Sequence, residues 1–393
     1  MNDDLKTLVR KRIAHHREDL IAASADLHAK PELAFEEHFA AERLTTLLEE
    51  AGFDVERGIH ELPTAFRATF GEGEFTIGIC AEYDALPDIG HACGHNLIAA
   101  MSVGAALGAS SVAERLGVRI QVLGTPAEEQ GAGKVLLLER GAFDPISVAM
   151  MAHPASDDQL PQITTSKALS RLSVEYTGRT AHAGYRPEDG INAADAATIA
   201  QVALGLARQQ TPPGHRLASL VREAGQSTNI IPDRAVVEAE LRAPTSAELA
   251  VLRKRAVACF EAGAVATGAE VRITATQPDL AELRQDPWMS DRYADNLRAL
   301  GRNPGPAHEG AGFSTDMGNV SQVIPSIHPL IGILGVRSQP HTRGFAEATV
   351  GPAAEATIVD GATALAWTAV DLGHDHEIRR RYSIEHRQRR DAG

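Results

Sequence analysis

Three continuous apolar runs alternate with helical segments near the start of the chain, and this alternation constrains the fold more than any other sequence feature. The runs lie at 75–84, 118–129 and 147–154, with helical segments between them at 95–116 and 131–141. Strands that are apolar along their whole length are buried on both faces, as in a parallel sheet covered by helices. The sequence therefore predicts an α/β fold around such a sheet.

The pattern changes near Lys167, where apolar and polar residues begin to alternate with a period of two. Segments 169–178 and 234–243 show this alternation, which is typical of an antiparallel sheet with one solvated face. Helical segments lie at 191–210 and 246–268. This region therefore predicts a separate α+β domain.

A length of 393 residues predicts two or three domains, or one body with a large insertion. Helical periodicity returns at 290–301 and 353–373, on either side of an apolar run at 328–336. We expect the basic segment after 373 to be exposed. The expected parts are a discontinuous catalytic body, 1–165 with 282–393, and an inserted domain, 166–281.

The composition excludes several classes of protein. Thirty-eight Lys and Arg against 52 Asp and Glu give a net charge of −14, which argues against non-specific nucleic-acid binding. Three cysteines form no disulfide framework and indicate a reducing compartment. The first 20 residues lack the apolar core of a secretory signal, and the apolar stretch 97–113 is short and rich in Ala, Gly and Ser. We expect a cytoplasmic protein that binds neither membranes nor nucleic acid.

Acids, histidines and one cysteine gather where the apolar runs end, which is where α/β sheets bind ligands. A single histidine, a pair of glutamates or an isolated cysteine is usually structural. Together they form a donor set that zinc, manganese, cobalt and nickel accept, and one of two adjacent glutamates can bind metal while the other acts as a general base. These residues are Glu82, Asp84, Cys93, His95, Glu128, Glu129, His153 and His341.

The string EYDALPDIGHACGHN, followed by TPAEEQGAGK and MAHP, resembles the aminoacylase and glutamate-carboxypeptidase family of metallopeptidases. GRTAHAG, STNIIPDRAVVEAELRA and PHTRGFAEA agree in order, so the resemblance covers nearly the whole chain except the basic tail. The EYDALP and CGHN variants point to the amidohydrolase branch that holds aminobenzoyl-glutamate and β-alanyl-dipeptide hydrolases. The resemblance implies a zinc-peptidase catalytic domain with an inserted ferredoxin-like domain that acts as a lid and forms a homodimer.

The resemblance also implies one or two divalent metal ions, Zn²⁺ or Mn²⁺, with Co²⁺ or Ni²⁺ as further options. Glu128 resembles the general base that activates water, and Asp84 resembles an aspartate that orients a ligand histidine. The role of Glu82 stays open between a function at the site and a structural ion pair, and no ligand role follows for His91 or His328. The implied metal ligands are Cys93, His95, Glu129, His153 and His341.

Three residues of the inserted domain enter the same interpretation. His182 in GRTAHAG resembles a histidine that stabilises the tetrahedral oxyanion, often from the partner subunit. Asn229 and Arg242 resemble positions that contact the carboxylate or amide of the substrate. Asp316, with Ser314–Thr315, is expected either to line the site or to cap a helix.

The predicted function is hydrolysis of an amide bond in a small molecule by a metal-dependent enzyme. Candidate substrates are an N-acyl amino acid, a dipeptide or an aminobenzoyl-glutamate-like compound. Two alternatives remain open. One is hydrolysis of another C–N bond, such as that of an aromatic amine. The other is a binding protein without catalytic activity on the same fold.

Overall fold

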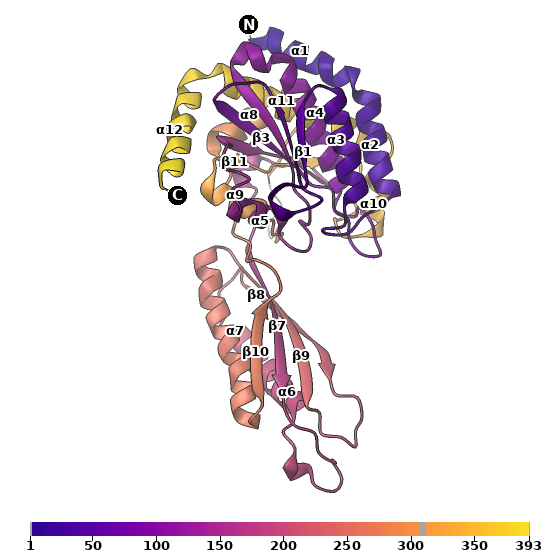
Figure 1. The fold of residues 1–393 in the computed structure, drawn as a ribbon, viewed down its shortest axis with the longest axis vertical. Coiled ribbons are helices and arrows are strands. Elements are labelled where there is room, and N and C mark those ends of the chain that lie inside the picture. Colours follow the sequence, from indigo (N-terminus) through magenta and orange to yellow (C-terminus); the bar gives the residue numbers. More distant parts are fainter. Residues whose placement is uncertain (1, 307–311, 393) are drawn as a thin grey trace. The chain divides into compact units, whose positions relative to one another are not determined.

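The computed structural model describes residues 2–306 and 312–392 and divides into two compact units (Figure 1). We call the first the body; it comprises Met1–Thr165, Leu283–Ala311 and Asp316–Gly393. The second, the inserted unit, comprises Ser166–Glu282 and Gly312–Thr315. The second segment belongs to the inserted unit although it lies outside the insertion that the sequence predicted. It is joined to the inserted sheet by a hydrogen bond of 2.9 Å from the Lys167 N–H to the Phe313 carbonyl.

The body contains a six-stranded mixed sheet in the order β1-β2-β4-β3-β5-β11. Strand β3 is parallel to β4 and β5, and β5 is parallel to β11, as expected from the apolar runs. The sequence pattern did not predict the other edge of this sheet, where β2 is antiparallel to β1 and β4. A short connection is sufficient for an antiparallel pair, and only 58–65 separates β1 from β2. The strands are β1 (Asp54–Arg57), β2 (Phe66–Phe70), β3 (Phe75–Ala81), β4 (Val118–Gly124), β5 (Val148–Met150) and β11 (Ser326–Ile327).

Two expected strands end earlier than the sequence suggested. Strand β4 stops at Gly124, so Glu128 and Glu129 lie on the turn that follows it. Strand β5 stops at Met150, and His153 begins a separate strand, β6 (His153–Ala155). That strand pairs in parallel with β12 (Leu330–Gly332), outside the main sheet.

Helix α4 forms the centre of the body and contacts β3, β4, α1, α2 and α11. By length and composition it is apolar enough to cross a membrane, but 94% of its most apolar window is buried inside the fold. Its glycines allow close packing, since a Cβ on Gly108 would lie 2.8 Å from the Ile13 side chain. The helices of the body are α1 (Asn2–His15), α2 (Arg17–Ala29), α3 (His38–Glu50), α4 (His95–Leu116), α5 (Gly133–Glu139), α8 (Pro287–Ala299), α9 (Met317–Val323), α10 (Arg343–Ala348), α11 (Pro352–His374) and α12 (His376–Ala392).

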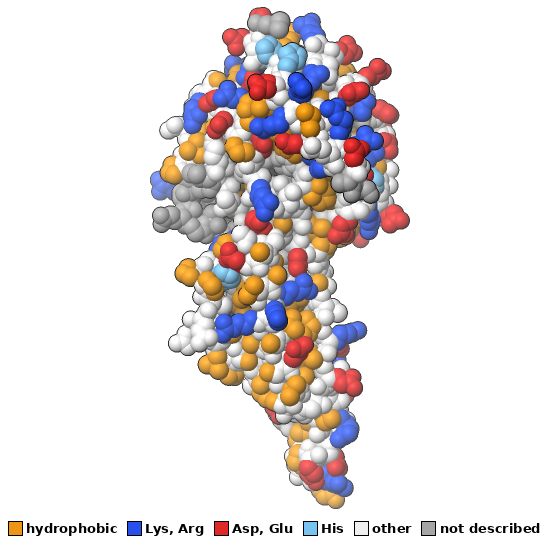
Figure 2. All heavy atoms as spheres, turned by 90° about the vertical axis from the view of Figure 1, so that its left-hand side faces the viewer, with side chains coloured by type: hydrophobic (Ala, Val, Ile, Leu, Met, Phe, Trp, Pro, Cys, Tyr) orange, Lys and Arg blue, Asp and Glu red, His pale blue; other side chains and the backbone are white. Residues whose placement is uncertain are grey.

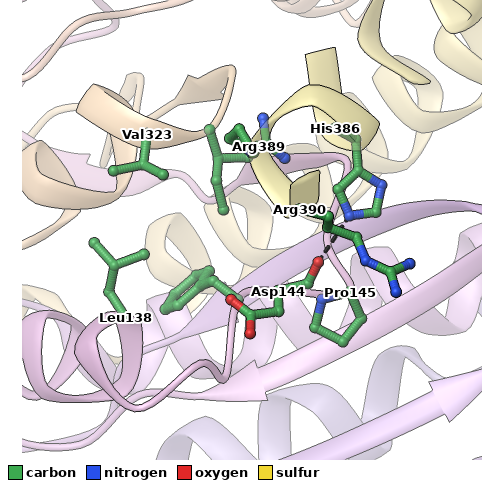
Figure 3. Close-up of a pocket in the computed structure, with 9 residues that line it drawn as sticks. Leu138, Asp144, Pro145, Val323, His386, Arg389 and Arg390 are labelled. Carbon is green, nitrogen blue, oxygen red and sulfur yellow. Dashed lines mark hydrogen bonds between the residues drawn. The ribbon is translucent and has the colours of Figure 1, made fainter. Parts of the chain in front are cut away.

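The basic tail is not an exposed extension, which corrects the expectation from its charge. It forms helix α12, whose Tyr382 and His386 are buried. The Tyr382 hydroxyl donates to Asp286 at 2.7 Å, and His386 Nε2 lies 2.7 Å from the Asp144 carbonyl oxygen. Helix α12 and residues around Asp144 and Val323 line a pocket of about 440 Å³. Figure 3 shows His386 among the side chains that line it. One face of this basic helix therefore packs against the body.

The inserted unit is a four-stranded antiparallel sheet in the order β10-β7-β9-β8, with two helices packed on it. The order β-α-β-β-α-β along the chain is the ferredoxin-like arrangement that the resemblance implied. Buried residues alternate with partly exposed ones along β9, as the period of two predicted. The elements are β7 (Ala168–Thr177), α6 (Ala193–Arg208), β8 (Arg216–Ala224), β9 (Arg234–Ala243), α7 (Ser246–Thr267) and β10 (Glu270–Ala275).

Candidate metal centre

Four chain segments of the body bring potential metal ligands to one place near the ends of β3 and β4. Cys93 Sγ lies 3.4 Å from His153 Nε2, and these two atoms form a group with His95 whose members lie within 4.8 Å of one another. A second group of the same size contains Cys93, Glu129 and His341. In it, His341 Nε2 lies 3.5 Å from Glu129 Oε2. Because Cys93 belongs to both groups, one thiolate can face two adjacent ions.

His95 has the environment of a metal-binding histidine. Its ring is fully buried, and Nδ1 lies 2.9 Å from both the carbonyl oxygen and a carboxylate oxygen of Asp84. Nε2 points to the other ligands and has no hydrogen-bond partner among the residues that the structure describes. A carboxylate on one ring nitrogen fixes the tautomer and leaves the second nitrogen for a metal. Asp84 therefore lies where it can orient the His95 ring.

The charge balance of the cluster also fits a cation. Burial raises the pKa of Glu128 well above its usual range, and the neighbouring Glu82 and Glu129 carboxylates raise it further. Burial likewise raises the pKa of the Cys93 thiol. Burial lowers the pKa of His153 to about 4, which leaves a neutral imidazole available as a ligand. A divalent ion reverses the first two effects, because it stabilises thiolate and carboxylate. The residues present therefore fit one or two divalent metal ions.

The turn that contains Glu128 and Glu129 is hydrogen-bonded to Asp84. The Glu129 amide donates to Asp84 Oδ2 at 2.9 Å, while Asp84 Oδ1 faces His95. Glu128 Oε2 lies 4.0 Å from His95 Nε2, in a group with His95 and Glu129. Glu128 therefore lies next to the two ligand groups that contain Cys93 but is a member of neither. A carboxylate in that position can accept a proton from a water molecule held at the cluster.

A buried ion cluster lies beside these ligands, and sequence reasoning missed its central residue, Lys134. Lys134 Nζ is 2.5 Å from Glu82 Oε1 and 2.7 Å from Asp316 Oδ1, and all three side chains are fully buried. Burial opposes ionisation of Glu82, but Lys134 together with the neighbouring histidines outweighs it and lowers the pKa of Glu82 to about 2. Glu82 therefore forms the structural ion pair that was one of its two open roles. The only sequence signal was a lysine inside the apolar run of α5.

Asp316 does not cap α9, the helix that it precedes, with its side chain. Its side chain instead accepts from the Lys134 amide and ammonium group. The alternative of a cap on α9 is therefore wrong, and the carboxylate instead binds an amide in the first turn of α5. His91 and His328 are both buried and belong to no ligand group among the described residues. Burial lowers the pKa of each to about 3, and the His328 ring stacks on His153 at 5.5 Å.

The candidate substrate residues of the inserted unit fall into two places. His182 and Asn229 are exposed and lie on adjacent loops, where the Ala183 amide donates to the Asn229 carbonyl at 3.0 Å. Arg242 lies on β9, where it donates to Glu240 and to the Gly312 carbonyl, both at 2.8 Å. Ser314 Oγ is 3.2 Å from Arg242, while the backbone of Gly178, near the His182 loop, pairs with the opposite end of β9 at Asp233. Within one inserted unit, Arg242 is therefore distant from His182.

Comparisons with known proteins agree with this geometry. Residues 164–267 match the peptidase dimerisation domain family. The chain is 39% identical over 388 residues to the Xaa-Arg dipeptidase of Mus musculus, covering 94% of this chain and 89% of that one. It is 30% identical over 257 residues to a p-aminobenzoyl-glutamate hydrolase chain of Escherichia coli strain K12, covering 60% of this chain and 53% of the other.

Among solved structures, the fold is similar to that of a dinuclear metal-binding peptidase of the M20 family from Bacillus subtilis. The TM-score is 0.69 with 23% identity, over 91% of this chain and 99% of the other. The match to the mouse dipeptidase covers 94% of the chain and therefore extends over both units. The chain is therefore an amidohydrolase that belongs to the M20 family of metallopeptidases.

Proposed function

We propose that the protein is a dipeptidase that removes an amino acid with a free carboxylate from the amine side of an amide bond. The single observation that carries this proposal is the Glu128 carboxylate beside the ligand groups that share Cys93. Dipeptides that end in arginine are the first candidates, because the relative that the chain matches over most of its length is an Xaa-Arg dipeptidase. N-acyl amino acids and aminobenzoyl-glutamate are the next candidates.

In this proposal Cys93, His95, Glu129, His153 and His341 hold the metal, with Zn²⁺ or Mn²⁺ as the preferred ions. When bound, the metal supplies a Lewis acid that polarises the scissile carbonyl and lowers the pKa of water. Glu128 takes the proton of the attacking water on its carboxylate and delivers it to the leaving amine nitrogen. Asp84 keeps His95 in its tautomer and holds the Glu129 amide, so that base and ligands keep a fixed separation.

We further propose that the protein is a homodimer assembled through the inserted unit. Helix α6 exposes Val202 and Leu206, at 59% and 69%, and packs on edge strand β8, which exposes Leu220 and Val221. Figure 2 shows hydrophobic side chains on the surface of the inserted unit. An apolar face beside an edge strand is a typical association surface, and the family match to a dimerisation domain supports this use.

A dimer also accounts for the separation between His182 and Arg242. Strand β9 extends from Arg234 to Ala243, so its two ends are roughly 30 Å apart at ~3.3 Å per residue. One substrate of dipeptide size cannot contact both ends. We therefore propose that Arg242 of one subunit binds the carboxylate of one substrate, while His182 and Asn229 of the same subunit act on the other substrate of the dimer.

The test is a panel of Xaa-Arg and Xaa-Lys dipeptides, N-acetyl amino acids and p-aminobenzoyl-glutamate, assayed with Zn²⁺- and Mn²⁺-loaded enzyme by mass spectrometry. Glu128→Gln should lose about 10²–10⁴-fold in turnover at unchanged metal content. The exposed Glu72→Gln variant is the matched control and should behave as wild type. Unchanged turnover in Glu128→Gln would contradict the assigned base, and release of ammonia without a second organic product would indicate hydrolysis of a different C–N bond.

A further inference from the structure

A second carboxylate, from a distant part of the chain, holds the turn that carries Glu128. Glu37 precedes α3, and its side chain is fully buried. Its Oε1 accepts the Ala127 amide at 2.8 Å, and its Oε2 accepts the Thr64 hydroxyl at 2.8 Å. The Tyr83 hydroxyl in turn donates to the Thr64 carbonyl at 2.6 Å. Glu37 therefore has fixed partners on both oxygens, and one of them is the residue directly before Glu128.

The residue that Glu37 holds has a strained backbone. Ala127 has a φ of +60°, in the left-handed region that costs a residue with a Cβ about 1–2 kcal/mol. Its carbonyl accepts the Gly133 amide at 3.2 Å, so the turn closes on the start of α5. A conformation of this kind persists only where its surroundings enforce it. The Ala127–Glu37 hydrogen bond is such a constraint.

The Glu37 segment touches the turn at a second point. Phe35, with a φ of +66°, lies against Gly131, where an added Cβ would stand 2.4 Å from the phenyl ring. Gly131 has a φ of +126°, so it meets both a steric and a backbone requirement for glycine. The segment 35–37 therefore fits the turn in shape as well as by hydrogen bonding.

The hydrogen bonds on the two sides of Glu128 form a symmetrical arrangement. Glu37 accepts the amide of residue 127, and Asp84 accepts the amide of residue 129. Burial and the Asp84 charge raise the pKa of Glu37 to about 7, but Oε1 can accept the Ala127 amide in either protonation state. The neutral amide of a glutamine offers the same acceptor, which provides a conservative variant.

We propose that Glu37 is a positioning residue that, through the Ala127 amide, fixes the direction in which the Glu128 carboxylate faces the metal centre. This inference rests on the proposed role of Glu128 as the base. The Glu37 carboxylate accepts its hydrogen bonds from Ala127 and Thr64, neither of which is a candidate metal ligand, so its effect reaches the reaction through the backbone of the turn. A displacement of about 1 Å in a catalytic group is sufficient to reduce turnover by about 10²-fold.

The test compares Glu37→Ala with Glu37→Gln, in the wild-type background and with Ala127→Gly. Turnover and KM are measured together with bound metal and with hydrogen exchange of the amides in 125–133. We expect Glu37→Ala to lower kcat about tenfold or more, with KM within about twofold and metal content unchanged. Exchange in 125–133 should accelerate. Glu37→Gln should stay within about threefold of wild type because it keeps the acceptor.

Ala127→Gly is the rescue variant, since glycine adopts a positive φ without the penalty. Added to Glu37→Ala, it should restore part of kcat, whereas a general loss of folding would not be repaired in this way. Faster exchange with unchanged kcat, or a fall in kcat that Ala127→Gly does not relieve, would overturn the proposal. If wild type cleaves no amide in the panel, the proposed function fails, but the exchange data still show whether Glu37 restrains the turn. Exchange in 125–133 that is as slow in Glu37→Ala as in wild type would overturn the inference by itself.

Discussion

The body and the inserted unit place their charged side chains in opposite environments. In the body, Lys134 pairs with Glu82 and Asp316, and all three side chains are 0% exposed. In the inserted unit, Arg234 pairs with Glu175 and Glu223 at the surface of the sheet, and its side chain is 49% exposed. A buried ion costs several kcal/mol of desolvation, whereas a surface pair contributes between 0 and about 1 kcal/mol.

This difference follows the chemistry of the two units. The body concentrates carboxylates around Cys93 and His95, and a fixed ammonium group beside them limits their mutual repulsion. The inserted unit has an apolar core of its own under a sheet whose charges remain in water. Changes to buried charge in the body should therefore affect both stability and catalysis, while matched changes in the inserted unit should affect neither strongly.

Metal removal should separate the two units most clearly. Chelation is expected to abolish amide hydrolysis, because Glu128 then lacks an activated water. It should also lower the stability of the body by about 3 kcal/mol relative to enzyme with the ion at 100 times its Kd. Hydrogen exchange with metal analysis is the measurement, and protection should fall around Cys93 and His95 but not in β7 and β9. An equal loss in both units would contradict the assignment of the metal site to the body.

Removing the buried ammonium group should have the next largest effect. Lys134→Met keeps the length of the side chain but leaves Glu82 and Asp316 buried without their cation, at an expected cost of about 3–5 kcal/mol in unfolding free energy. The matched Arg234→Met in the inserted unit should cost no more than about 1 kcal/mol. Urea unfolding of both variants gives the comparison. Similar losses in unfolding free energy for the two variants would contradict the burial of the Lys134 ion cluster.

The contrast between the units also explains which features the sequence could reveal. The alternation in β7 and β9 and the acids after β3 are local patterns, so they were predictable from neighbouring residues. Lys134 was not, because its partners Glu82 and Asp316 lie far away in the chain and a lysine beside apolar residues usually reaches solvent. Strands such as β6 and β12 have only three residues each, which is too short to show a period.

Helix α12 shows a different limit of the sequence. Its many arginines indicated an exposed tail, yet Tyr382 and His386 face the body. An amphipathic helix with only a few apolar residues gives a weak periodic signal, and its partners come from a region about 240 residues earlier, such as Asp144. Composition predicted the charged face of the helix but could not predict its packed face.

Two glycines offer a comparison with opposite expected signs. Gly133 begins α5, and a Cβ there would stand 1.9 Å from the Pro126 carbonyl oxygen. Gly133→Ala must displace the turn that carries Glu128, with a loss of about 1–3 kcal/mol and lower turnover. Gly205 lies on exposed α6 with open space at its Cβ, so Gly205→Ala should stabilise the inserted unit by about 1 kcal/mol. Thermal unfolding and kcat provide the measurements, and a neutral Gly133→Ala would show that the turn has room to adjust.

The smallest expected effect is a weakening of the packing of α12 against the body at acidic pH. Burial lowers the pKa of His386, and Arg389 and Arg390 oppose its protonation further. The unfolded chain therefore binds more protons just below pH 6.5, so the stability of this contact is present above that pH and is lost as pH falls through the lowered pKa. Hydrogen exchange of α12 should accelerate over that range, while the His386→Gln variant should show no such dependence. The Asp144 carbonyl still accepts a hydrogen bond from the glutamine amide, so the same acid response in the variant would assign the effect to groups other than His386.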